Sequence, residues 1–220
     1  MTTPITNTPV KTNAYVQVEG GVNNYTNTKQ ANLGATLGGT ISKGGTFAKA
    51  EVGYGSALRA KTEVGHEFNI GKNMGLELSA NAAYAKSNTQ NSYNTKFTIA
   101  TDEQTQTMSM SKKWHDGYKK AGGAMMMTFT GKNGNVKAGV EIGAYTNNAP
   151  DISTNYNATV KNENGNNQNY ISHHELKAHH SGMYATPKVS GELNLGKTSN
   201  WSLVANADRF GGNAGVRFKF

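Results

Sequence analysis

Hydrophobic and polar residues alternate with a period of two along much of this chain. In residues 75–86, Leu76 and Leu78 fall on one face of the period, and Glu77 and Ser79 fall on the other. Such alternation is typical of a β-strand with one apolar and one polar face. The same pattern predicts ten strands, which cover 14–23, 30–42, 46–55, 58–70, 75–86, 121–131, 135–146, 183–195, 201–209 and 212–220.

The connections between these strands are of two kinds. Short turns rich in Gly, Asn and Lys follow every second strand, whereas two of the other connections, 87–120 and 147–182, are long. Strands of about 9 to 13 residues can cross a bilayer when tilted. Short turns on one side with long loops on the other are typical of outer-membrane barrels. The short turns are 42–46, 71–74, 131–135 and 196–200.

We therefore predict an all-β fold, a transmembrane antiparallel up-and-down β-barrel of ten strands with short periplasmic turns and two long extracellular hairpin loops. Eight strands are the alternative if 30–42 and 46–55 do not cross the membrane. The prediction treats 1–220 as a single outer-membrane β-barrel domain with an N-terminal tail at 1–13. A soluble β-sandwich with aromatic residues at its strand ends is the competing interpretation.

Composition agrees with strands that are apolar on one face only. Hydrophobic residues make up 35% of the chain, and the mean hydropathy is −0.63. No segment approaches the roughly 18 consecutive apolar residues that a membrane-spanning helix needs. The chain has no cysteine, which excludes disulfides and thiolate metal sites.

Aromatic residues gather near both ends of the predicted strands, as interfacial girdles do in membrane barrels. Tyr145 and Tyr184 depart from this pattern, because they fall on the polar face of their strands. Near the short turns lie Phe47, Phe68, Phe129, Trp201, Phe218 and Phe220. Near the long loops lie Tyr25, Tyr54, Tyr84, Tyr145, Tyr184 and Phe210.

The final strand ends in GVRFKF, where Val216, Phe218 and Phe220 alternate with two basic residues. This ending resembles the C-terminal signature of bacterial outer-membrane β-barrel proteins. The resemblance implies recognition by the outer-membrane assembly machinery and a bacterial outer-membrane location. The strand number is similar to that of the opacity-type adhesins and the omptin proteases, although no sequence motif matches either group.

The first ten residues, MTTPITNTPV, contain neither the basic nor the apolar region of a secretory signal peptide. Two explanations are open: a leader has been removed and Met1 added, or the protein is not secreted. The barrel pattern favours the first explanation. We therefore expect an outer-membrane protein whose signal peptide is absent from this sequence.

Charged residues on the inward faces of the predicted strands are nearly balanced in sign. Buried charges persist only when they are paired or hydrated, so we expect an ion-pair network that fills a narrow lumen. Glu19, Lys49, Asp208 and Lys219 also face inward. The residues assigned to the network are Glu51, Arg59, Lys61, Glu63, Glu67, Glu77, Lys137, Glu141, Lys188, Glu192 and Arg217.

The formal charge of +8 is then expected in turns and loops, and the segment 111–120, SKKWHDGYKK, is rich in lysine. A cationic patch with aromatic residues can bind lipopolysaccharide phosphates, acidic glycans or a partner protein. The simpler interpretation is a strand end that anchors at the membrane interface. The candidate partner-binding residues here are Lys112, Lys113, Trp114, His115, Tyr118, Lys119 and Lys120.

The segment HHELKAHH, 173–180, is one residue too long for a zinc-protease motif. His174 and Glu175 are followed by His179, so the spacing that puts two imidazoles on one metal is missing. Adventitious Zn²⁺ or Ni²⁺ binding is one interpretation, and a solvated loop that gains positive charge at mildly acidic pH is the other. No metal or cofactor is expected. The candidate partner-binding residues here are His173, His174, His179 and His180.

No catalytic constellation is recognisable, because the four aspartates form neither Asp-x-Asp nor Asp-x-His. We predict that the protein is not an enzyme but binds a partner through 87–120 and 147–182, in adhesion or in recognition of a host, phage or envelope component. We expect contact with outer-membrane lipid and lipopolysaccharide, no nucleic-acid partner and a monomer. The alternatives are a narrow channel for small solutes and an outer-membrane hydrolase.

Overall fold

The computed structural model describes residues 8–220 except 26–27, 102–103, 149–150, 162–164, 177–178 and 197–198, and it leaves undescribed the side chains of 25, 28, 113, 148, 151–153, 161, 176 and 179. Within this described part every regular element is a β-strand. None of these residues forms a helix that is long and apolar enough to cross a membrane.

The chain divides into two compact units. The barrel unit comprises Met1–Asn88, Gly117–Asn147 and Ser181–Phe220. The loop unit comprises Thr89–Asp116 and Asn148–His180. The loop unit therefore falls within the two long connections that the sequence predicted as extracellular loops.

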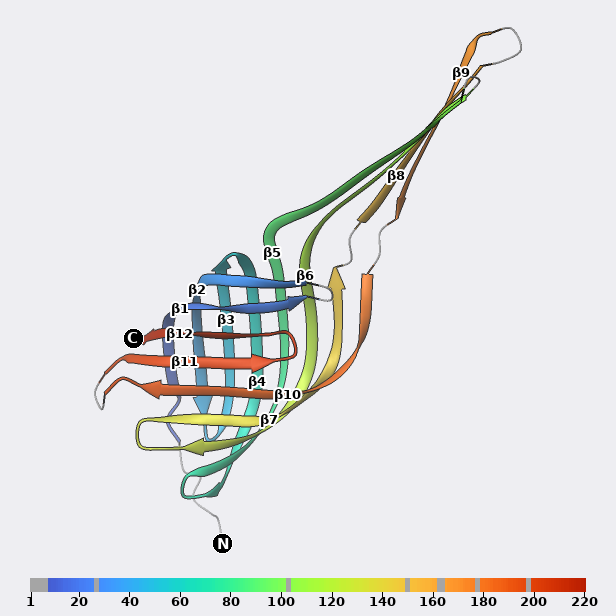
Figure 1. Ribbon diagram of the computed structural model, residues 1–220. Coiled ribbons are helices and arrows are strands. Elements are labelled where there is room, and N and C mark those ends of the chain that lie inside the picture. The colour runs from blue at the N-terminus through green and yellow to red at the C-terminus, as the bar shows by residue number, and fades with distance from the viewer. Residues whose placement is uncertain are drawn as a thin grey trace. The chain divides into compact units, whose positions relative to one another are not determined.

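Ten strands form a closed antiparallel barrel, as predicted. They pair in the order β1-β2-β3-β4-β5-β6-β7-β10-β11-β12, and β12 pairs with β1 to close the ring. Figure 1 shows the barrel strands side by side, with β1 beside both β2 and β12. Their bounds are β1 Lys11–Tyr25, β2 Thr28–Lys43, β3 Thr46–Gly55, β4 Ala57–Gly71, β5 Met74–Ala100, β6 Gln104–Thr130, β7 Gly134–Asn148, β10 His179–Asn194, β11 Trp201–Asp208 and β12 Gly211–Lys219.

The turn between β2 and β3 shows why Gly is placed in the short connections. Gly44 has φ +57° and Gly45 has φ +88°. Positive φ at both central residues is the requirement of the type I′ turn, whose twist matches that of the two strands it joins. The turn joins Lys43 directly to Thr46, which are register partners.

The two faces of the barrel strands are opposite in character. The polar residues buried on the inside include Gln17, Glu19, Thr36, Asn81 and Glu141. The outward positions between them carry exposed aliphatic and aromatic side chains, among them Val18, Leu33, Leu37, Val52, Val64, Val140, Leu193 and Phe129. A polar interior and an apolar exterior are the arrangement of a transmembrane β-barrel.

The loop unit is a four-stranded antiparallel sheet. It is built from the second part of β5, the first part of β6, β8 (Asp151–Lys161) and β9 (Asn167–Leu176). The strands pair in the order β5-β6-β8-β9. The β6–β8 pairing joins the two long connections into one sheet, which the separate hairpins expected from the sequence did not include.

Candidate functional site

Eight acidic and eight basic side chains form the ion pairs of the lumen. All eleven residues that the sequence assigned to this network take part, and each of the sixteen members lies within 3.9 Å of an oppositely charged side chain. The additional members are Glu19, Lys49, Lys120, Asp208 and Lys219.

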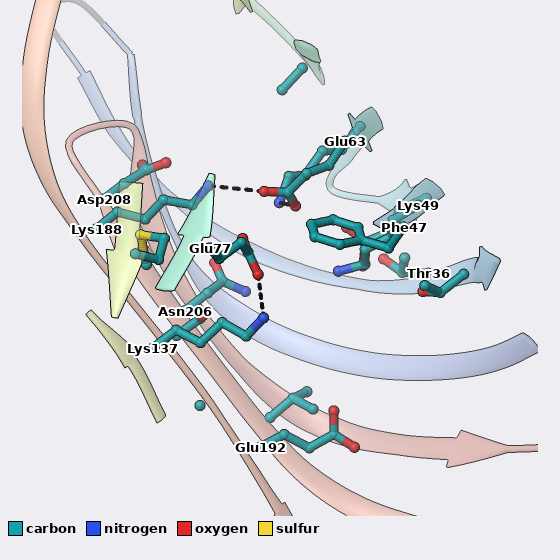
Figure 2. Close-up of a pocket in the computed structure, with 18 of the residues that line it drawn as sticks. Thr36, Phe47, Lys49, Glu63, Glu77, Lys137, Lys188, Glu192, Asn206 and Asp208 are labelled. Atoms are coloured by element: carbon teal, nitrogen blue, oxygen red, sulfur yellow. Dashed lines mark hydrogen bonds and ion pairs between the residues drawn. The ribbon is translucent and has the colours of Figure 1, made fainter. Parts of the chain in front are cut away.

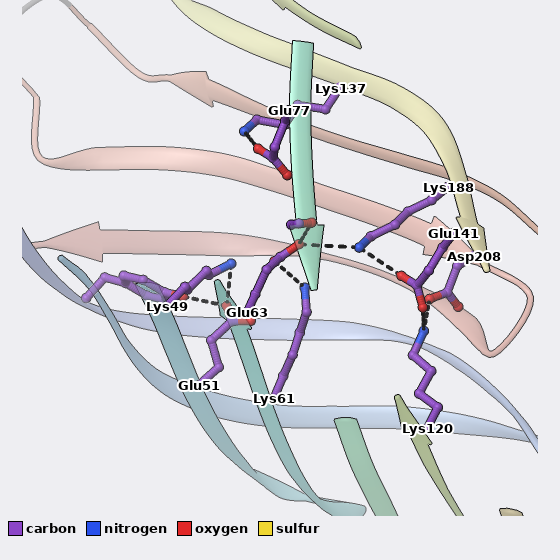
Figure 3. A network of polar contacts seen from close by, with 12 residues as sticks. Lys49, Glu51, Lys61, Glu63, Glu77, Lys120, Lys137, Glu141, Lys188 and Asp208 are labelled. Carbon is purple, nitrogen blue, oxygen red and sulfur yellow. Dashed lines mark hydrogen bonds and ion pairs between the residues drawn. The ribbon is translucent and has the colours of Figure 1, made fainter. Parts of the chain in front are cut away.

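Glu141 on β7 lies at the centre of the network and is only 1% exposed. Its two carboxylate oxygens lie 2.9 Å from the Nζ atoms of Lys120 and Lys188. The Tyr184 hydroxyl donates a hydrogen bond of 2.6 Å to the same carboxylate. Figure 3 shows Lys188 between Glu63 and Glu141, and Lys120 between Glu141 and Asp208. Removal of Glu141 would therefore leave two buried ammonium groups short of a counter-charge.

Several of these bonds join strands that are not neighbours in the barrel. Lys188 on β10 reaches Glu63 on β4 at 3.6 Å, and Arg59 on β4 reaches Glu19 on β1 at 2.8 Å. Because the partners lie across the ring from one another, their side chains occupy the lumen. Figure 2 shows Lys188 and Lys137 extending toward Glu63 and Glu77. The network therefore bridges the interior of the barrel at these positions.

Arg217 on β12 is the centre of a second group of contacts in the lumen. Its guanidinium donates to the Gln17 side chain at 2.8 and 3.0 Å and pairs with Glu192 at 3.1 Å. The same group lies 4.1 Å from the centre of the Tyr15 ring, and the Tyr15 hydroxyl donates to Glu51. A planar, multidentate donor suits this role better than lysine would.

A cavity of about 690 Å³ remains between these side chains. Its lining includes Ser42 and Gly45 at the short-turn end, and Asn23 and Phe210 at the other end of the barrel. The cavity therefore extends along the barrel between the bridging side chains.

An aromatic cluster inside the barrel was not predicted. The Phe210 ring packs against Tyr118 at 4.9 Å, Tyr184 at 5.1 Å and Tyr145 at 5.8 Å between centroids. The Lys120 ammonium lies 4.5 Å from the centre of the Phe210 ring. These residues belong to the barrel interior rather than to an interfacial girdle, which corrects the expectation for Phe210 and agrees with the polar-face assignment of Tyr145 and Tyr184. Phe47 also lines the cavity.

The lysine-rich segment 111–120 does not form one surface patch. Lys120 is buried and pairs with Glu141 and Asp208, and Tyr118 packs on Phe210. This placement corrects their predicted role in partner binding. The cause is that β6 is continuous from Gln104 to Thr130, so Lys120 continues the inward series of Ala124, Met126 and Thr128. Lys119 is exposed, and Lys112 and His115 are half-buried; the side chain of Lys113 lies outside the described residues.

The remaining loop candidates have local partners. The Trp114 indole donates to Asp116 at 2.9 Å. His174 bonds Ser172 at 2.8 Å, and His173 bonds Asn155. Neighbouring strand residues point to opposite faces, so His173 and His174 do not converge. His180 is exposed, and the side chain of His179 lies outside the described residues. Within the described residues, no three His, Asp or Glu side chains are placed to hold a metal.

One face of the loop unit is mainly polar, and the other, called the apolar face below, carries most of its large apolar side chains. Met108 pairs with Tyr156, and Ala158 pairs with Tyr170, so these four side chains share a face. A hydrogen bond joins Thr98 and Thr107 at 3.3 Å on the opposite face. The neighbours of Thr98, Phe97 and Ile99, therefore lie on the face of Met108. Within the described loop unit the apolar side chains of this face are Tyr93, Phe97, Ile99, Met108, Met110, Tyr156, Ala158, Val160 and Tyr170, and the polar side chains of Gln106, Gln168 and Ser172 lie among them.

The opposite face of the loop unit is mainly polar. Thr159 donates to Asn169 at 2.9 Å, and Thr107 and Asn157 are register partners. Ile171, which is 79% exposed, is an apolar residue on this polar face. It lies next in sequence to Tyr170 and provides a natural control for the apolar face.

Strand closure, an apolar exterior and an ion-paired interior together define the class of protein: the chain is a β-barrel of the bacterial outer-membrane type. No protein-family model and no curated protein matches it.

Among solved structures the chain is similar to three membrane proteins. The toluene transporter TodX of P. putida is 10% identical, with 96% of this chain and 67% of that chain covered and a TM-score of 0.34. The attachment invasion locus protein Ail of Yersinia pestis is 9% identical, with 95% and 97% covered and a TM-score of 0.28. The translocator domain of the autotransporter NalP of Neisseria meningitidis is 12% identical, with 98% and 88% covered and a TM-score of 0.27. Similarities this low carry no argument about activity, so the assignment of class rests on the barrel itself.

Proposed function

We propose that this outer-membrane barrel is a surface-binding protein, acting in adhesion or recognition, whose partner docks on the apolar face of the loop unit. The observation that carries the proposal is the exposure of large apolar side chains there: Phe97 is 60% exposed, Tyr170 53% and Ile99 51%. Apolar patches that stay exposed on a folded surface are typical of interaction sites. The expected loops 87–120 and 147–182 both contribute to this face.

The architecture of the loop unit supports the same conclusion. A β-sheet with one apolar face normally buries that face against a second layer. The described residues of the loop unit form a single sheet. A partner that covers Phe97, Met108 and Tyr170 would supply the second layer, with the aromatic side chains as anchors.

Charge contributes little to this surface. The loop unit contains five lysines and six acidic residues, so its net charge is close to zero. Binding that depends on apolar contact is only weakly screened by salt. We therefore expect the bound fraction to change little when the salt concentration is raised, in contrast to the binding that a cationic patch would give.

The test uses bacteria that display the protein, applied to arrays of immobilised extracellular-matrix proteins and glycans. Replacing Phe97, Met108 and Tyr170 by serine should reduce retention at least tenfold, because burial of each such side chain contributes about 1.5–3 kcal/mol. The matched control Ile171→Ser removes a similar exposed apolar side chain from the polar face. It should change retention by less than about twofold, because an exposed substitution away from the binding face has a small effect.

The control for folding is the migration of each variant on a gel before and after boiling. Retention that survives the triple replacement in a folded barrel would refute the proposal. An equal loss of retention in Ile171→Ser would mean that the partner does not bind specifically to the apolar face. If the unaltered protein is retained on nothing in the arrays, adhesion to these ligand classes is refuted.

A narrow channel is the second candidate, and the cavity of about 690 Å³ that is lined from both ends of the barrel favours it. Planar-bilayer recording distinguishes the two functions. Stable conductance steps that change in size when Glu67 or Arg59 is neutralised would favour the channel. The bonds that cross the lumen, such as Lys188 to Glu63, lead us to expect no such steps.

A further inference from the structure

The outer surface of the barrel carries an apolar groove next to the turn between β2 and β3. Strands β2, β3 and β4 lie side by side (Figure 1), and their registers place Ile41, Ala48 and Val64 in one row. Ile41 is 56% exposed and Val64 is 55% exposed, with the small Ala48 between them. The groove is lined by Val10, Ile41, Ser42, Lys43, Thr46, Phe47, Ala48, Val64, Gly65 and His66.

A polar row closes the groove at its turn end. The registers place Lys43, Thr46 and His66 next to one another across the same three strands. The Thr46 hydroxyl and His66 Nδ1 are 2.8 Å apart, and the His66 ring packs on Phe68 at 4.5 Å. When the Thr46 hydroxyl donates to Nδ1, the proton of the neutral ring is on Nε2, which is then a donor. These contacts fix the imidazole beside Thr46, in the same row as Lys43.

The charges around the groove favour an anion. All eight acidic residues of the barrel unit are in the lumen ion pairs, so none competes for the cations outside. Lys43 forms no ion pair with any described residue. The same holds for the other described lysines in or beside the short turns, which are Lys11, Lys72 and Lys132.

We propose that this groove is a binding site for one glycerophospholipid, with the phosphate accepting from Lys43 and from Nε2 of His66, which Thr46 orients, and with one acyl chain over Ala48 between Ile41 and Val64. The groove is continuous with the apolar exterior that faces the bilayer. Its polar row lies at the strand ends, at the level where head groups meet protein. An anion without an acyl chain would leave the apolar part empty, and an acyl chain without phosphate would leave Lys43 without a counter-charge.

The test measures lipid retained by the detergent-folded full-length protein in native mass spectrometry. The probes are phosphatidylglycerol, phosphatidylcholine and diacylglycerol, which has the same chains without phosphate. We expect one bound phosphatidylglycerol, weaker phosphatidylcholine and little diacylglycerol. Two variants test the polar row and the apolar groove separately. The double variant Lys43→Ser with His66→Ser removes the phosphate partners, and Ala48→Leu fills the groove at a lipid-facing position. Each should weaken phosphatidylglycerol binding at least tenfold, equivalent to about 1.4 kcal/mol.

Lys72→Ser is the matched control, because it removes one short-turn charge outside the groove. It should change binding by less than about twofold, since an exposed charge contributes little. Val64→Ala, which widens the groove without filling it, replaces Ala48→Leu if that variant does not fold, and it should weaken retention about threefold. Equal loss in Lys72→Ser would overturn the site in favour of a diffuse cationic collar. Unchanged binding in Ala48→Leu, or no retained lipid in the unaltered protein, would also overturn it. These outcomes are independent of whether the loop unit binds a partner.

Discussion

The barrel unit and the loop unit are both built from strands with alternating polar and apolar residues, but the two units differ in what covers the faces of those strands. In the barrel unit the polar faces turn inward and their charges are paired, while the apolar faces meet lipid. In the loop unit the sheet does not close on itself: β9 pairs with β8 alone in the described order, and the face that carries Phe97 and Tyr170 stays exposed. The comparison teaches that the ring of barrel strands leaves no strand edge unpaired, whereas the loop unit keeps open edges and large exposed apolar side chains.

The largest effect is expected from Glu141→Ala in the lumen. The variant leaves Lys120 and Lys188 buried with fewer counter-charges, and loss of one partner of a buried pair costs about 3–5 kcal/mol. Urea unfolding in lipid vesicles, followed by the fluorescence of Trp201 in the barrel unit, measures the change. A loss below about 1 kcal/mol would show that water, rather than Glu141, stabilises these two lysines.

A smaller effect is expected from Phe210→Ala, and it tests the contrast between the two units. Phe210 is 5% exposed and contacts three tyrosines, so truncation should lower the free energy of unfolding by about 3 kcal/mol. Phe97→Ala in the loop unit removes the same side chain from an exposed site and should leave the unfolding of the barrel unchanged. Equal losses in the two variants would contradict the contrast between a buried Phe210 in the barrel unit and an exposed Phe97 in the loop unit.

The smallest effect is expected from Glu67→Gln. Its carboxylate lies 3.6 Å from Lys137, is one-third exposed, and shares that lysine with Glu77. A partly solvated pair contributes about 0–1 kcal/mol, so the midpoint of urea unfolding should move little. A loss as large as that of Glu141→Ala would contradict the graded importance of the lumen ion pairs.

Much of the barrel could be predicted from the sequence, because the period of two assigns each residue of a strand to one face. Glu63, Glu141 and Lys188 were placed inward on that basis alone. Lys120 was misplaced because the strand was started at 121, and the alternation in fact runs through 104–130. Extending the pattern from Ala124 back through Gly122 would have placed Lys120 inside.

The structure of the loop unit was less accessible to sequence reasoning. Each long connection shows its own alternation, so two hairpins could be predicted. The pairing of Met108 with Tyr156 joins residues from different connections, and no local pattern specifies a long-range register of this kind. The apolar face becomes visible only when that register is known.

The most direct test of the account is gel migration of the detergent-folded protein in SDS, unboiled and boiled, for the full chain and for a variant in which short turns replace 89–116 and 148–180. A closed membrane barrel resists SDS until it is heated, because its backbone hydrogen bonds are all satisfied within the ring. The account predicts that both proteins run at a different apparent mass after boiling. No shift in the full chain would contradict a closed membrane barrel, and a shift in the full chain alone would contradict the independence of the barrel unit from the loop unit.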